Sequence, residues 1–66
     1  MNEQQCKALD IVYKPELENA THGTVMFKGQ QFHFQKMKKN EWEGWFHGHD
    51  DEVTVSSSLF ELLQEA

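Results

Sequence analysis

The chain has 66 residues, a net charge of −5, 38 % hydrophobic residues and 12 % aromatic residues. This length predicts a single small domain, 1–66, with a thin stability margin, because so short a chain buries only about 60 % of its unfolded surface. The single cysteine, Cys6, excludes an internal disulfide and a CxxC-type zinc site. No window approaches the roughly 18 apolar residues of a membrane span, and no export signal is visible. We therefore expect a cytoplasmic protein that makes no membrane contact.

The charge is distributed unevenly along the chain. Residues 1–23 carry −2, residues 24–40 carry +4 and residues 41–66 carry −7. An acidic protein is a poor general binder of duplex DNA, which requires a dominant positive field. The basic segment 24–40 leaves room for a local anionic partner.

The first 23 residues carry the weakest structural signals. Alternating apolar residues with a β-branched pair favour a strand over 8–13, preceded by a frayed segment 1–7. A short helix over 2–9 is the alternative. Because Pro15 suits the first position of a helical turn, we expect 14–23 to be a connecting loop or such a turn.

Segment 24–47 alternates with strand period and contains four of the five Phe and both Trp. A two-residue turn at Gly29-Gln30 is predicted, with Gly where positive φ is wanted. This turn pairs Phe27 with Phe32 and Val25 with Phe34.

A second, three-residue turn over 38–40 is predicted, closed by Asn40 in the left-handed conformation. This longer loop is favoured because it keeps the apolar face continuous. It pairs Lys36 with Trp42, Phe34 with Gly44 and Phe32 with Phe46. Gly44 would leave room for the Phe34 ring.

The C-terminal part predicts a fourth strand over 52–55 and a helix that starts at Ser58, where Ser58 and Glu61 fit a capping box. The fold class is therefore α+β: an antiparallel β-meander of three to four strands, with a further N-terminal strand if 8–13 is extended, packed against one C-terminal α-helix. The predicted core consists of Val25, Phe27, Phe32, Phe34, Trp42, Phe46, Val53, Val55, Leu59, Leu62 and Leu63.

The leading functional prediction is a small non-catalytic protein-interaction module that binds through the sheet face or edge left open by the helix. Exposed aromatic and basic side chains are typical of interfaces. The predicted binding surface consists of Trp45, Met37, Lys36, Lys38 and Lys39. We expect an unidentified protein partner, or a homodimer formed through an edge strand, in a bacterial or phage-like host. No cofactor and no enzymatic activity are expected, because no nucleophile elbow or phosphate loop is present and the domain is too small for a closed pocket.

Single-stranded nucleic-acid binding is the alternative. In GTVMFKGQQFHF, a lysine lies beside aromatic residues on adjacent strands, as in proteins that stack single-stranded bases. The string resembles the nucleic-acid-binding strands of cold-shock domains, which pair a GTV-like strand with a KGxGF-like one. It departs from that pattern at Gln30-Gln31, where a Gly-aromatic-Gly run would be expected.

A third hypothesis is a divalent metal site in the loop 47–51. His47, His49 and Asp51 supply the nitrogen and oxygen ligands that Zn²⁺ accepts, and His22 or His33 would complete the set. The other interpretation is a polar hairpin loop, in which such residues are common.

Overall fold

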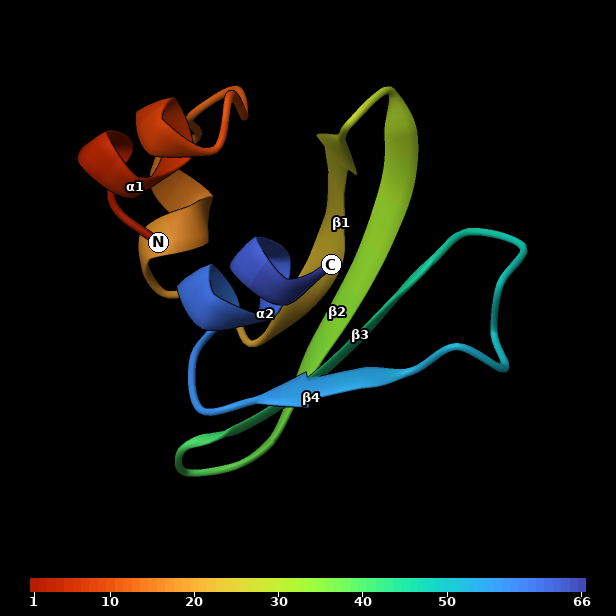
Figure 1. Cartoon of the computed structure of the whole chain (residues 1–66). Helices are drawn as coiled ribbons and strands as arrows, with labels where there is room; N and C mark the ends of the chain where they lie inside the picture. Colours follow the sequence, from red (N-terminus) through yellow and green to blue (C-terminus); the bar gives the residue numbers. More distant parts are fainter.

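A computed structural model describes all 66 residues and has the predicted α+β fold (Figure 1). Four antiparallel strands form one sheet in the order β1-β2-β3-β4, so each strand pairs with the next along the chain. The elements are α1 (Glu3–Ala8), the 3₁₀ helix η1 (Pro15–Glu18), β1 (His22–Phe27), β2 (Gln30–Lys38), β3 (Glu41–Phe46), β4 (Thr54–Ser56) and α2 (Leu59–Glu65). In Figure 1, α2 lies across one face of the strongly twisted sheet, beside the N-terminal helices.

The first hairpin turns one residue earlier than predicted. Lys28 and Gly29 occupy the turn with φ values of 55° and 76°, the two positive values that a two-residue I′ turn requires. The predicted register was therefore wrong. The observed pairs are Val25 with Phe32 and Phe27 with Gln30, instead of Val25 with Phe34 and Phe27 with Phe32. Moving the turn by one residue shifts the pairing by two, so the same side chains still face the core.

The second hairpin has the predicted register from Lys36 inward, but the predicted three-residue turn over 38–40 is one residue shorter, because Lys38 belongs to β2 and pairs with Glu41. Phe32 lies opposite Phe46, Phe34 opposite Gly44 and Lys36 opposite Trp42, with an irregularity between Lys36 and Lys38. Asn40 has a φ of 62°, the left-handed conformation expected of it. The space above Gly44 is filled by the rings and methyl groups of Phe32 and Leu62, however, and not by Phe34.

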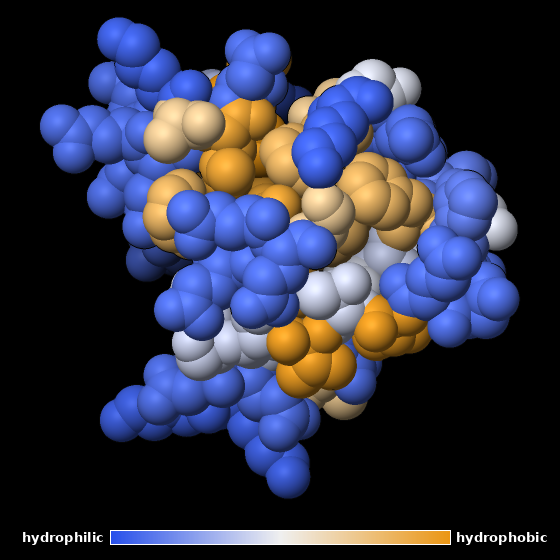
Figure 2. Space-filling model, in the orientation of Figure 1, coloured by the Kyte–Doolittle hydropathy of each residue, from blue (hydrophilic) through white to orange (hydrophobic).

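The fourth strand is shorter than predicted, and its valine side chain points to the face of the sheet opposite to the predicted one. It spans Thr54–Ser56 and pairs Ser56 with Trp42. This register turns Ser56 toward α2, where its hydroxyl donates to the Glu65 carboxylate at 2.7 Å. Val55 therefore points to the opposite face, and both Val53 and Val55 are exposed, so their assignment to the core was wrong. Apolar surface is visible over β4 in Figure 2.

The C-terminal helix starts as predicted, with half of the expected capping box. The Ser58 hydroxyl accepts a hydrogen bond from the Glu61 amide at 3.2 Å. The Glu61 carboxylate accepts from the Ser57 hydroxyl at 2.6 Å instead of reaching back to the Ser58 amide. The helix buries its apolar stripe, Leu59, Leu62 and Leu63, against the sheet.

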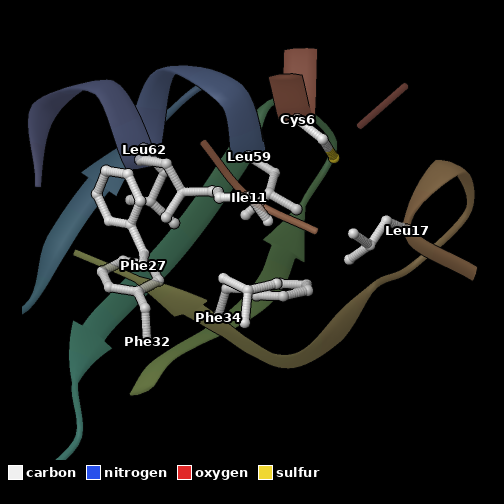
Figure 3. Close-up of a cluster of buried hydrophobic side chains, with 10 residues drawn as sticks. Cys6, Ile11, Leu17, Phe27, Phe32, Phe34, Leu59 and Leu62 are labelled. Atoms are coloured by element: carbon white, nitrogen blue, oxygen red, sulfur yellow. The ribbon is translucent and has the colours of Figure 1, made fainter. Parts of the chain in front are cut away.

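The core lies between α2 and one face of the sheet (Figure 3). Of the residues predicted there, Val25, Phe27, Phe32, Phe34, Leu59, Leu62 and Leu63 are buried, while Trp42 and Phe46 are partly buried against them. The Phe46 ring meets the Phe32 ring edge-on at 5.1 Å and stacks on the Phe27 ring at 6.4 Å, two geometries favoured by aromatic quadrupoles. Three buried residues were missed: Cys6, Ile11 and Leu17.

These three residues belong to the N-terminal segment, whose secondary structure was predicted incorrectly. The predicted strand over 8–13 is wrong, because residues 3–8 are helical and the following residues form no strand. Asn2 and Gln5 form a complete capping box: the Asn2 side chain accepts from the Gln5 amide at 2.8 Å, and the Gln5 side chain accepts from the Asn2 amide at 3.0 Å. The 3₁₀ helix η1 begins at Pro15, as predicted for a helical turn.

Candidate functional site

The open face of the sheet, which turns away from α2, carries part of the predicted binding surface. Met37 and Met26 are exposed there. Trp45 is half-buried and lies opposite His33, with the two ring centroids 6.0 Å apart. Polar side chains interrupt this face, because Gln35 donates to the Glu43 carboxylate across the strands at 3.3 Å. The open face is therefore mixed, with separate apolar spots.

The three predicted lysines do not join this surface as a group. Lys36 pairs with Trp42 and lies on the α2 side of the sheet, with its ammonium 5.8 Å from the centre of the Trp42 ring. A cation at this distance over a ring face is attracted by the ring quadrupole. Lys38 and Lys39 are exposed at the end of the β2-β3 hairpin. Lys36 is thus separated from Trp45 by the thickness of the sheet.

The loop 47–51 does not assemble a three-ligand site. His47 turns to His33, with Nδ1 of His47 2.9 Å from Nε2 of His33. His49 lies near the Glu52 carboxylate, 3.7 Å away. No group of three or more His, Cys, Asp or Glu side chains is close enough to hold a metal ion. The predicted set of His47, His49 and Asp51 is therefore not brought together, because the loop directs its imidazoles to different neighbours.

A groove of about 400 Å³ runs beside β1, between that strand and the loop after α1. Its lining residues are Ile11, Val12, Lys14, Leu17, Thr24, Val25, Met26 and Gln31. Val12 is 77 % exposed and Met26 is 57 % exposed, so apolar surface remains accessible to a partner. The only charged side chain in the lining is Lys14.

The main chain of β1 has a free edge along this groove. The backbone bond from Lys36 N to Thr21 O fixes which residues of this strand pair with β2. In an antiparallel pair alternate residues exchange both of their hydrogen bonds, so the odd-numbered residues of β1 bond to β2. Residues 22, 24 and 26 therefore direct their N–H and C=O groups away from the sheet. No backbone hydrogen bond joins residues 11–14 to β1.

Two titratable groups outside the groove and the open face have raised pKa values. Burial raises the pKa of the Cys6 thiol, which disfavours the nucleophilic thiolate. Tyr13 donates its hydroxyl hydrogen to Glu18 at 2.5 Å, and this bond raises the pKa of Tyr13 to about 12. A second hollow of about 330 Å³ is lined by Glu18, Lys36 and Trp42 among others. Its one acid is already bound to Tyr13.

Sequence reasoning missed the β1 groove because it placed residues 8–13 in a strand. The exposed β-branched residue Val12 was the available signal, and it was attributed to strand propensity. With the segment in its observed non-strand conformation, Ile11 is buried and Val12 remains on the groove rim.

No protein-family model, curated protein or solved structure matches this chain. None of its helices has the length and apolar composition needed to cross a bilayer. The groove and the exposed face are therefore the basis for inferring a function.

Proposed function

We propose that this protein is a small non-catalytic interaction module that binds an extended segment of a partner protein along the free edge of β1. The observation that carries the proposal is the coincidence of an apolar groove with unpaired main-chain groups at residues 22, 24 and 26. An added strand gains affinity from main-chain hydrogen bonds and specificity from pockets for its alternate side chains.

The side chains that line the groove indicate which kind of partner segment would bind there. Ile11, Val12 and Met26 favour apolar side chains at alternate positions of an extended peptide. Lys14 favours a carboxylate at one end, because it is the only charge in the lining. The buried, unpaired Cys6 fits the reducing cytoplasm in which we place this interaction.

The proposal is tested by selecting peptides from a displayed random library on the purified protein and mapping a selected peptide by amide NMR. We expect enriched sequences with alternating apolar residues, and shifts at the amides of residues 22, 24 and 26. Val12→Glu should weaken binding, because it places a charge in the apolar groove while the native side chain is already exposed. Val55→Glu is the matched control, since Val55 is also exposed but lies on β4.

Three results would contradict the proposal. The first is that no sequence is enriched. The second is that the NMR shifts fall on the open face around Trp45. The third is that Val55→Glu weakens binding as much as Val12→Glu does. Analytical sedimentation of the free protein tests whether the groove is occupied by a second copy of the chain. A dimer that Val12→Glu dissociates would show that the groove receives a second copy of this chain instead of a peptide.

Single-stranded nucleic acid is a second candidate ligand, favoured by one observation on the open face. The rings of Trp45 and His33 lie side by side there, and base stacking on such rings is worth about 1–3 kcal/mol per base. Trp fluorescence should be quenched by an oligonucleotide at low salt and recover at high salt. Absence of quenching at low salt would eliminate this candidate.

A further inference from the structure

Two histidines from different strands meet on the open face of the sheet. His33 belongs to β2, and His47 directly follows β3. Nε2 of His33 lies 2.9 Å from Nδ1 of His47, and the two ring centroids are 5.1 Å apart. The backbone of His47 is held in place, because its amide donates to the Gln31 carbonyl of β2 at 2.8 Å. The sheet therefore fixes the spacing of the two imidazoles.

The far side of the His33 ring is also held. Its Nδ1 lies 2.9 Å from the Thr24 hydroxyl oxygen on β1. When Nδ1–H donates to that oxygen, Nε2 carries the lone pair and faces His47. Imidazole ligands of metal ions almost always have such an outer partner, which fixes the tautomer and the ring orientation.

We propose that His33 and His47 together bind one divalent ion of the kind that favours imidazole, represented by Zn²⁺. Zinc binds histidine nitrogens at about 2.0–2.1 Å, so two such bonds place the nitrogens about 2.9 Å apart at a right angle and about 3.3–3.4 Å apart at the tetrahedral angle. The observed separation of 2.9 Å equals the right-angle value, and a small rotation of the exposed His47 ring would give the tetrahedral one. When the ion binds, the proton on His47 Nδ1 moves through solvent to Nε2 of the same ring, so both facing nitrogens offer lone pairs, and water completes the coordination.

The other two histidines are not placed to join this pair. His49 lies against Glu52, with Nδ1 3.7 Å from the carboxylate. His22 interacts with its neighbour Thr21 at 3.2 Å. Both are exposed and serve as matched controls, because each offers one imidazole without a second imidazole facing it.

The experiment is a titration of the whole protein with Zn²⁺ alone, followed by calorimetry and by the NMR signals of the four imidazole rings. We expect saturable binding of one ion per chain, with large shifts only at His33 and His47. His33→Gln and His47→Gln should each weaken binding by at least the roughly tenfold seen when an outer-shell partner is lost. Thr24→Val should weaken it by about tenfold or more while retaining the site. His22→Gln and His49→Gln should bind as the parent does.

Absence of saturable binding to the folded parent would overturn the proposal. Equal shifts at all four rings, or loss of binding in His49→Gln, would also overturn it, because the ion would then bind elsewhere. Circular dichroism of each variant verifies folding. The zinc result is independent of the peptide result, since the first is read from the His33 and His47 rings and the second from the β1 amides.

Discussion

The tightest steric constraint in the fold is at Gly44, and Gly44→Ala tests it. A Cβ at this position would lie 2.5 Å from two ring carbons of Phe32 and 2.7 Å from a methyl carbon of Leu62. Phe32 is 1 % exposed and Leu62 is 0 % exposed, so neither can move into solvent. Overpacking of this kind costs about 1–3 kcal/mol, and alanine regains about 0.5–1 kcal/mol of the conformational cost of glycine in a strand.

We therefore expect Gly44→Ala to lower the free energy of unfolding by about 1–2 kcal/mol. In a domain of this size that corresponds to a fall in Tm of about 5–15 °C, measured by circular dichroism. Phe32→Leu removes the two ring carbons that clash, so the same alanine should cost less in that background. A Tm equal to or above that of the parent, or an identical cost in both backgrounds, would refute the packing described here.

Three further predictions concern the core, the helix cap and the one tyrosine. Phe34→Ala should lower the free energy of unfolding by about 3–5 kcal/mol, and an unchanged urea midpoint would contradict its burial. Ser58→Ala should cost about 1 kcal/mol by removing the acceptor for the Glu61 amide, whereas Ser58→Asp, which keeps an acceptor, should cost little. The bond to Glu18 raises the pKa of Tyr13 from its ordinary value of about 10 to about 12, so the contribution of this bond to stability is present below pH 10 and lost as the pH rises through 12. Ultraviolet titration of tyrosinate should follow that pKa, Tyr13→Phe should abolish this pH dependence of stability, and a midpoint near the ordinary value would contradict the hydrogen bond.

The sequence predicted most of the meander because several signals agreed there. In the β2-β3 hairpin, Asn40 and the apolar parity of both strands specified the same register, and the structure has it. In the β1-β2 hairpin the glycine was recognised but its position in the turn was wrong. Lys28 takes a positive φ of 55° beside Gly29, which lysine propensity does not predict.

The sequence failed where a short segment depends on distant neighbours. Val53 and Val55 are β-branched residues typical of a buried strand, yet both are exposed. In the observed register Ser56 faces α2 instead and donates to the Glu65 carboxylate. The N-terminal helix depends on Cys6 reaching the core and on a capping box formed by Asn2 and Gln5, which is a less common pair than Ser and Glu. Local propensity predicts neither the Ser56–Glu65 contact nor the packing of Cys6 in the core.

The same limitation applies to the candidate site. The groove arises where the loop containing Val12 approaches β1, and no sequence spacing specifies that approach. The His33–His47 contact follows from the correctly predicted register, because Gln31 faces His47 and His33 is two residues farther along β2. From the sequence, His33 was named as a possible additional ligand for the loop 47–51, but it was not predicted that His33 and His47 face each other.

The free edge of β1 is the central claim, and amide hydrogen exchange of the uncomplexed protein tests it most directly. The amides of residues 23, 25 and 27, which bond to β2, should exchange slowly, whereas those of residues 22, 24 and 26 should exchange rapidly. On addition of a selected peptide, the second set should become protected. Equal protection of both sets in the free protein would contradict the account, because the edge would then already be paired.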